Sequence, residues 1–245
     1  MRANKKISLI VQARLGSTRL PGKILENLGG YSALEHNLKR CLKIRNIDEV
    51  CCAIPDSSEN DVIEAEALAI GVKVVRGPEQ DVLARYYKAA IDLNSDIIVR
   101  VTSDCPFIEP EVIAQTIDLF LESNADCACN NHPPSWPHGF DCEVTSLTWL
   151  KRAHQEATLP TDREHVMPFV RTHPDITLVN LACPHADWKR QRWTLDYPED
   201  LEFFRSICSH LDDPLNAQTQ DIMNVLKHFP ELRSINQSHH EKSRE

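Results

Sequence analysis

The sequence predicts an α/β fold with a mostly parallel β-sheet flanked by helices, and three observations support this prediction. Short apolar, β-branched runs alternate with stretches of helical periodicity through residues 6–123. Each helical stretch is long enough to connect two parallel strands by a right-handed crossover. The 245 residues are 42% hydrophobic and 26% charged, a balance typical of a globular protein with a buried core.

The first half of the chain contains four predicted strands and four predicted helices. The apolar, β-branched run at residues 6–12 indicates a buried strand, and residues 31–44 place apolar side chains on one helical face. Gly71 stands where a left-handed helix cap is expected, and Pro110 stands in the first turn of the last helix. The predicted strands are 6–12, 49–54, 72–75 and 96–101, and the predicted helices are 31–44, 60–70, 81–93 and 110–123.

The pattern beyond Asp126 is less regular. Prolines, histidines and a glycine predict a loop at residues 131–139, followed by a strand at 141–145 and a helix at 146–157. Thr161 and Glu164 have the spacing of a capping box, which predicts a helix capped at Thr161. Further strands are predicted at 176–181 and 192–195, and a helix at 198–208. We expect a single domain over residues 1–235 and a flexible polar tail over residues 236–245.

Composition excludes several functional classes. The formal charge of 27 − 36 = −9 argues against general nucleic-acid binding, which requires a basic face. The apolar run at residues 7–11 is too short for a signal peptide, and no segment approaches the ~20 apolar residues of a membrane helix. We therefore expect a cytoplasmic protein that binds no membrane. The nine cysteines lack zinc-site spacing, so we expect reduced, structural thiols, with metal binding as the minor alternative.

The loop that follows the first strand, residues 13–23, predicts an anion site. It holds the cations Arg14, Arg19 and Lys23 together with hydroxyls and glycines, at the sheet edge where α/β proteins bind ligands. These cations supply the countercharge for a polyphosphate. The segment is neither a Walker A loop nor a dinucleotide fingerprint. A solvated basic turn is the alternative interpretation.

Two aspartates stand at the ends of predicted strands and suit a divalent cation. Asp104 follows the strand at 96–101, and Asp196 follows the strand at 192–195. Magnesium commonly uses one or two carboxylates together with phosphate oxygens. A turn or helix-capping role is the alternative for Asp104, whereas helix capping explains Glu199 and Asp200 better than it explains Asp196.

Two polar clusters, residues 138–143 and 162–166, suit recognition of a polar ligand, although a loop or cap network is the alternative for both. Neither contains a zinc-protease motif, and no G-x-S-x-G serine elbow is present.

Together, these segments resemble the cytidylyltransferase family that activates eight- and nine-carbon sugar acids, most closely its branch of spore-coat polysaccharide cytidylyltransferase-like proteins. The resemblance rests on residues 13–23, 81–86, 100–106, 139–144, 163–166 and 195–201, in family order. It implies a Rossmann-like nucleotidyltransferase sheet of the glycosyltransferase-A-like kind, with a substrate and dimerisation region inserted at about residues 130–185. It also implies a homodimer.

The resemblance further implies CTP as a substrate, Mg²⁺ as cofactor and a sugar acid or related sugar as acceptor. The motif around Asp104 differs from that of many sugar-acid enzymes, so the resemblance does not identify the acceptor and leaves another nucleoside triphosphate as the alternative to CTP. The implied catalytic residues are Arg14, Lys23 and Asp104. The implied nucleotide-binding residues are Arg14, Leu15, Gly16, Ser17, Arg19, Lys23, Arg85 and Asp104. The implied acceptor-binding residues are Asp141, Glu143, Arg163, Glu164 and His165, and the implied metal ligands are Asp104 and Asp196.

The expected reaction is an in-line attack by the acceptor on the α-phosphorus of the nucleotide, with release of pyrophosphate. Positioning and charge stabilisation account for most of the catalysis of such a transfer. A sugar-nucleotide-dependent glycosyltransferase and a non-catalytic nucleotide-binding protein are the alternatives. The segment at Asp104 lacks the D-x-D motif that would favour the glycosyltransferase.

Overall fold

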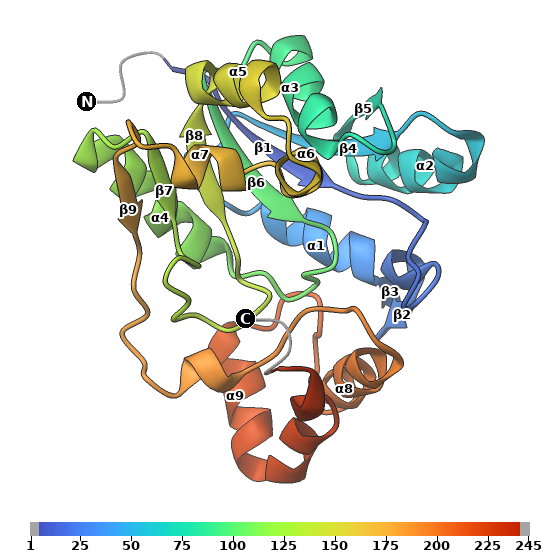
Figure 1. The fold of residues 1–245 in the computed structure, drawn as a ribbon. Helices are drawn as coiled ribbons and strands as arrows, with labels where there is room; N and C mark the ends of the chain where they lie inside the picture. Colours follow the sequence, from blue (N-terminus) through green and yellow to red (C-terminus); the bar gives the residue numbers. More distant parts are fainter. Residues whose placement is uncertain (1–4, 241–245) are drawn as a thin grey trace.

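The computed structural model describes residues 5–240 and contains a seven-stranded sheet of order β5-β4-β1-β6-β8-β7-β9 (Figure 1). Strands β1, β4, β5 and β6 are mutually parallel, and β8 runs antiparallel between β6 and β7. The prediction of a mostly parallel sheet is therefore confirmed. The strands are β1 (Ile7–Gln12), β4 (Glu49–Pro55), β5 (Lys73–Gly77), β6 (Ile97–Thr102), β7 (Cys127–Cys129), β8 (Glu143–Ser146) and β9 (Leu178–Asn180).

Helices cover both faces of this sheet. Successive residues of a strand point to opposite faces, so each strand packs against both layers of helices. In β1, Leu9 and Val11 pack with one group of helices, whereas Ile10 packs with Tyr86 in the other group. Burial on both faces explains why the strands are continuously apolar. The first group contains α1 (Ala33–Cys41), α2 (Asp61–Ile70) and α4 (Pro110–Ser123); the second contains α3 (Val82–Asp92), α5 (Leu147–Glu156), α6 (Pro160–His165) and α7 (Pro168–Thr172).

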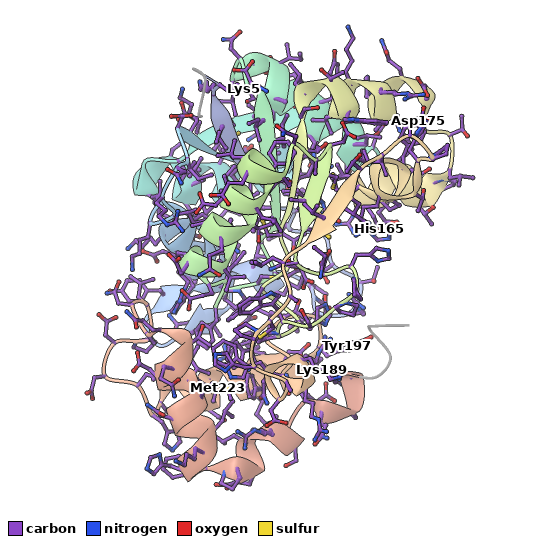
Figure 2. All side chains as sticks on the ribbon, turned by 90° about the vertical axis from the view of Figure 1, so that its left-hand side faces the viewer. Lys5, His165, Asp175, Lys189, Tyr197 and Met223 are labelled. Atoms are coloured by element: carbon purple, nitrogen blue, oxygen red, sulfur yellow. The ribbon has the colours of Figure 1, made fainter. Side chains whose placement is uncertain are left out.

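A third apolar cluster lies at the other end of the molecule, around Trp193, Phe204 and Ile222. Its helices are α8 (Pro198–Cys208) and α9 (Thr219–His228), followed by the short 3₁₀ helices η4 (Pro230–Ser234) and η5 (Gln237–His239). A two-stranded sheet, β2 (Asn27–Leu28) and β3 (Tyr31–Ser32), contributes Leu28 to the same cluster. Figure 2 shows Tyr197 and Met223 in this helical part of the molecule.

The predicted strand at residues 192–195 is wrong. The backbone donors of this segment bond to separate partners: Trp193 donates to the carbonyl of His138 at 2.6 Å, and Leu195 donates to that of Asp104 at 2.8 Å. Only an isolated bridge joins His138 to Arg192. The alternation that suggested a strand arises because Trp193 and Leu195 enter the third cluster while Arg192 and Asp196 join a polar network.

Two local predictions about chain ends are also corrected. Helix α6 begins at Pro160 with Leu159 as its N-cap, so Thr161 lies inside the helix and does not cap it. Proline sets the helical φ at the first position, which moves the start upstream. The predicted flexible tail begins too early, because Asn236 is 3% exposed and donates to the Asp200 carboxylate at 2.9 Å. Residues 241–245 of that tail lie outside the described part of the chain.

The backbone at Gly139 lies very close to the backbone at Trp193, and a substitution of Gly139 tests whether the fold depends on this contact. Its φ is +118°, and a Cβ there would lie 2.2 Å from the carbonyl oxygen of Trp193. We expect Gly139→Ala to destabilise the fold by about 3 kcal/mol or more, because the backbone must move. Gly71→Ala is the matched control: its φ is +87° and its Cβ position is open. Urea unfolding should show a loss of only about 1 kcal/mol for it, and equal losses for the two variants would contradict this account.

Candidate active site

The loop after β1 forms one wall of a cavity of about 770 Å³ at the carboxyl edge of β1 and β6. The strand order reverses around β1, which places this cavity at a topological switch point. Asn60 holds the loop by accepting from the Leu15 amide at 3.0 Å, and Gly22 turns the chain with a φ of +70°. Nine predicted site residues line the cavity: Arg14, Gly16, Ser17, Arg19, Lys23, Arg85, Asp104, Glu164 and His165.

The ammonium group of Lys23 bridges the two aspartates that were predicted as metal ligands. Its Nζ lies 3.0 Å from Asp104 Oδ2 and 2.8 Å from Asp196 Oδ1, and the Lys23 side chain is only 12% exposed. Burial alone lowers the pKa of Lys23, but the charges of Asp104 and Asp196 outweigh it and raise that pKa. Burial alone raises the pKa of Asp104, but Lys23 and a hydrogen bond from Thr102 hold it well below its ordinary value. Lys23 and Asp104 are therefore both charged at neutral pH.

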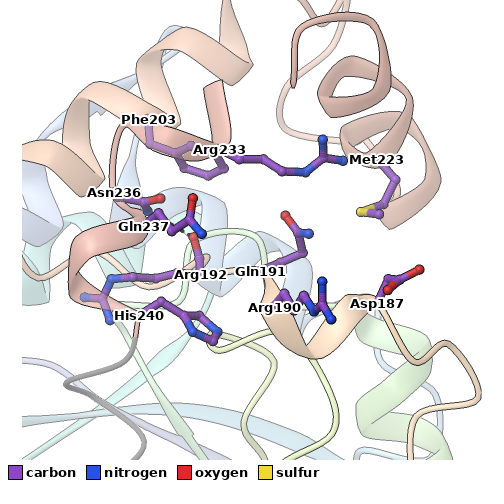
Figure 3. A pocket seen from close by; sticks show the side chains of 10 residues that line it. All are labelled: Asp187, Arg190, Gln191, Arg192, Phe203, Met223, Arg233, Asn236, Gln237 and His240. Carbon is purple, nitrogen blue, oxygen red and sulfur yellow. Dashed lines mark hydrogen bonds between the residues drawn. The ribbon is translucent and has the colours of Figure 1, made fainter. Parts of the chain in front are cut away.

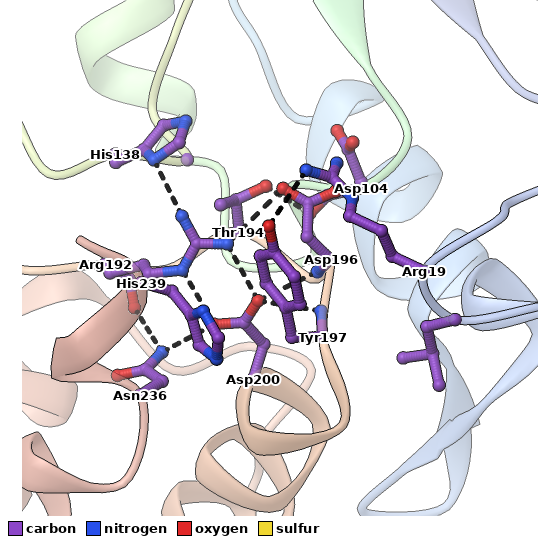
Figure 4. A network of polar contacts seen from close by, with 12 residues as sticks. Arg19, Asp104, His138, Arg192, Thr194, Asp196, Tyr197, Asp200, Asn236 and His239 are labelled. Atoms are coloured by element: carbon purple, nitrogen blue, oxygen red, sulfur yellow. Dashed lines mark hydrogen bonds and ion pairs between the residues drawn. The ribbon is translucent and has the colours of Figure 1, made fainter. Parts of the chain in front are cut away.

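Asp196 is fixed from three sides, and Figure 4 shows Arg19 and Arg192 on two of them. Besides Lys23, the guanidinium of Arg19 donates to it at 2.7 Å and that of Arg192 at 3.3 Å. Arg192 is in turn held by the Asp200 carboxylate, with both bonds at 2.8 Å. That same carboxylate accepts from the backbone amide of Asp196 at 2.9 Å. The first turn of α8 thus determines where the Asp196 side chain points.

Arg85 brings a buried cation to the cavity from α3. The residue is 1% exposed, and its Nη1 donates to the carbonyls of Pro78 at 2.7 Å and Glu79 at 2.9 Å. Among the described residues, no carboxylate lies within ion-pair distance of it, and burial lowers its pKa. A buried guanidinium without a counterion favours an anionic or carbonyl-rich ligand.

Glu143 does not reach the cavity itself. It is 1% exposed, and its carboxylate accepts from Arg100 at 2.7 Å and also pairs with Arg171. Arg100, which does line the cavity, also donates to Gln12 at 3.2 Å. The structure therefore gives Glu143 a supporting position behind Arg100.

Glu164 and His165 line the cavity and stand just before an uncommon turn at the end of α6. Val166 has φ +69° and ψ −52°, and the amide of Met167 donates to the carbonyl of His165 at 2.7 Å. This geometry is a γ-turn with positive φ, which is rare and strained for a β-branched residue. Val166 is fully buried, so packing holds the turn. Such strain costs about 1–3 kcal/mol and is common at functional sites.

Three further predicted residues lie outside the cavity. Leu15 packs against the apolar cluster beneath the loop. Arg163 donates from Nε to Asp81 at 3.0 Å, across the start of α3. Asp141 accepts from the amide of Gly139 at 3.0 Å within its own loop.

The donor set fits a divalent cation that also binds a phosphate. Among the described residues, no group of three or more His, Cys, Asp or Glu side chains could hold a metal ion. Asp104 and Asp196 nevertheless converge, since both lie within 3.0 Å of one Lys23 nitrogen. Two carboxylates completed by phosphate oxygens and water suit Mg²⁺.

A sequence profile of the family described as cytidylyltransferase matches residues 8–224. The chain belongs to the cytidylyltransferase family. This finding confirms the resemblance inferred from the sequence motifs. The match includes residues of every strand of the sheet, the residues that line the cavity, and α8.

Two full-length relatives and two solved structures show the extent of the similarity. This cytidylyltransferase is 32% identical over 240 residues to an uncharacterised protein of Methanocaldococcus jannaschii, covering 97% of each chain. It is 29% identical to the spore coat polysaccharide biosynthesis protein SpsF of Bacillus subtilis, covering 92% of this chain and 95% of that one. A cytidylyltransferase structure from Leptospira borgpetersenii superposes with a TM-score of 0.88 at 31% identity, covering 94% and 97%. A CMP:2-keto-3-deoxy-manno-octonic acid synthetase solved with CTP shares the fold, with a TM-score of 0.62, 18% identity and coverage of 83% and 98%.

Sequence reasoning did not assign the residues that support this site. Arg100 stands within a buried strand, and Asp200 resembles an ordinary helix-cap residue. Arg192 was placed in a strand that does not form. The roles of these three residues follow from contacts between segments that are distant in sequence. An arginine inside an apolar strand, such as Arg100, is nevertheless a signal of a polar site that the sequence contains. Among residues 5–240, no helix has both the length and the apolar content to cross a membrane.

Because Lys23 bridges the two aspartates, we expect the stability lost in Lys23→Met to depend on pH. The lowered pKa of Asp104 stabilises the wild-type fold above the ordinary carboxyl pKa, and this contribution is lost as pH falls. In Lys23→Met the carboxylates face each other without the ammonium, which raises the pKa of one of them. We therefore expect a loss of about 3 kcal/mol at pH 8 that shrinks toward pH 4.

Urea unfolding between pH 4 and pH 8 measures this difference. Lys88→Met is the matched control, because Lys88 forms an exposed pair with Asp92 and its loss should change stability by less than about 0.5 kcal/mol. A Lys23→Met deficit that is constant with pH would show that the bridge is not electrostatic.

Proposed function

We propose that this cytidylyltransferase transfers CMP from CTP to a sugar acid or related sugar and releases pyrophosphate. The observation that carries the proposal is the convergence of Arg14, Arg19 and Lys23 with two carboxylates at the carboxyl edge of β1 and β6. A triphosphate requires such a cluster of cations, and a divalent cation requires the carboxylates. The relatives point to the pathway: one is named for spore coat polysaccharide biosynthesis, and a structure with the same fold was solved with CTP.

The loop cations divide into two groups by their present partners. The Arg14 side chain is 47% exposed and lies 3.9 Å from Glu164, so it is available to a phosphate. Lys23 and Arg19 are bound to Asp196. We infer that entry of the β- and γ-phosphates draws the Lys23 ammonium away from the aspartates, which leaves both carboxylates facing a cation. Arg85 lies deeper in the cavity and suits the nucleoside or the α-phosphate.

We propose Mg²⁺ as the cation and Asp104 and Asp196 as its protein ligands. When bound, the ion would neutralise phosphate charge and lower the pKa of the attacking hydroxyl. The chain's own residues keep this site in place: Arg192 and Asp200 hold Asp196. Asp104 remains ionised because its pKa is lowered. Arg14 and Lys23 hold the leaving pyrophosphate, so that the reacting atoms stay in line.

We assign the acceptor end of the cavity to Glu164 and His165, which line it just before the γ-turn at Val166. We propose that Glu143 acts through Arg100, and that Arg163 acts by securing the start of α3. Asp141 shapes the loop before β8. These three residues are positioning residues in this proposal, because none of them lines the cavity.

We further propose a homodimer formed through residues 130–185 of a single domain, as the family resemblance implies. Leu159 in that range is 60% exposed and would be covered. The particle mass in solution tests this, since a monomer has 27.9 kDa. We place the reaction in the cytoplasm: all nine cysteines are free, and burial raises the pKa of thiols such as Cys51 and Cys208 to about 12.

Pyrophosphate release with Mg²⁺, four nucleoside triphosphates and a panel of sugar acids and sugar phosphates tests the proposed reaction. We expect release that requires CTP and one acceptor. Asp104→Asn should lower turnover at least about 100-fold, because it removes charge from the reacting centre. Asp92→Asn, an exposed aspartate on α3, is the control. CTP binding without release for any acceptor would favour the non-catalytic alternative, and release of the nucleoside diphosphate from a sugar nucleotide would favour the glycosyltransferase.

The assignment of the acceptor end gives a separate kinetic prediction. We expect Glu164→Gln and His165→Ala to raise KM for the acceptor about tenfold or more while KM for CTP changes less than about twofold, since a lost hydrogen bond to a charged group is worth about 1.5–3 kcal/mol. Glu156→Gln, exposed on α5, is the control. If these two variants changed only KM for CTP, Glu164 and His165 would bind the nucleotide and not the acceptor.

A further inference from the structure

A second cavity, of about 430 Å³, lies between residues 187–192 and the C-terminal segment (Figure 3). Residues 188–190 form the short 3₁₀ helix η3 (Trp188–Arg190) on one side, and η4 and η5 form the other side. Phe203 of α8 and Met223 of α9 provide an apolar wall. No part of the proposed reaction uses this cavity.

The charge of this cavity is positive, although the chain as a whole carries −9. Arg190 and Arg233 line it from opposite sides, and neither has a carboxylate within ion-pair distance among the described residues. Arg233 donates from Nη1 to the carbonyl of Leu226 at 2.7 Å, which leaves further donors for a ligand. Asp187 is the one acidic residue in the described lining. Two arginines without counterions favour a carboxylate or phosphate.

Gln191 adds an independent observation. The residue is 8% exposed, yet its side-chain amide forms no hydrogen bond with a described residue, and Figure 3 shows it pointing into the cavity. A nearly buried amide without a protein partner is uncommon. Gln237 points into the cavity from the opposite side. Amides in this position can both donate to and accept from the hydroxyl groups of a ligand.

We propose that this cavity is a second binding site, separate from the catalytic cavity, for a small hydroxylated anion such as a sugar phosphate or a sugar carboxylate. Arg190 and Arg233 bind the oxyanion, Gln191 and Gln237 bind hydroxyl groups, and Phe203 covers the carbon skeleton. Among residues 5–240, the two cavities share no lining residue. Arg192 stands between them: it lines the second cavity and also donates to Asp196.

Isothermal titration calorimetry of the full chain with glucose 6-phosphate, gluconate and orthophosphate tests the site. We expect glucose 6-phosphate or gluconate to bind, and the comparison of the two identifies phosphate or carboxylate as the anion. Orthophosphate should bind more weakly, because it presents no carbon skeleton. Arg190→Gln and Arg233→Gln should each weaken binding at least about tenfold, the loss expected for one charge-assisted hydrogen bond. Gln191→Ala should weaken it about fivefold, the loss expected for one hydrogen bond between neutral groups.

Two control variants distinguish binding in this cavity from binding at the nearby surface or in the catalytic cavity. Lys189→Gln removes an adjacent exposed cation that does not line the cavity, and Arg14→Gln alters the catalytic cavity; both should keep the affinity within about twofold. Because Arg190 is exposed and makes no ion pair with a described residue, Arg190→Gln should leave urea unfolding unchanged. The proposal is overturned if no probe binds at millimolar concentration, if Arg190→Gln and Arg233→Gln bind normally, or if Arg14→Gln alone abolishes binding.

Discussion

The ammonium of Lys23 between Asp104 and Asp196 is the interaction on which the rest of the catalytic site depends. The three groups come from three separate segments: the loop after β1, the loop after β6 and the turn before α8. Two carboxylates that approach one point repel each other unless a cation lies between them. Without a ligand, Lys23 supplies that cation. The same arrangement therefore stabilises the fold and keeps together the two carboxylates that we propose as metal ligands.

Asp200 extends this constraint to the C-terminal part of the chain. Its buried carboxylate bonds to Arg192, to the amides of Asp196 and Tyr197, and to Asn236. A fully buried carboxylate is tolerated only when it is paired and hydrogen-bonded in this way. The last described segment thus helps to support Asp196, and His239 stacks on Tyr197 with ring centroids 3.9 Å apart.

Local patterns predicted six of the seven strands of the sheet, most of its helices and the loop cations, because strand burial and helix caps are properties of short segments. Helix α4 matches its prediction at both ends, and Gly71 takes the left-handed φ that its position predicts. The errors occur where partners are distant in sequence: Arg192 alternates like a strand residue but belongs to a polar network. Glu143 lies in a polar segment of the kind that binds ligands, but its carboxylate accepts a hydrogen bond from Arg100 behind the cavity. No periodicity reports such pairings.

The distribution of counterions, and not the net charge, separates binding cations from structural ones. Arg76 has two carboxylates within reach and Arg45 also has two, so their charge is already neutralised on the surface. Arg85, Arg190 and Arg233 have none among the described residues, and all three line cavities. An excess of acids over the whole chain is screened within about 10 Å at ordinary ionic strength. A small anion inside either cavity therefore responds to the unpaired guanidinium groups next to it, and an acidic protein can bind polyphosphates without a basic surface.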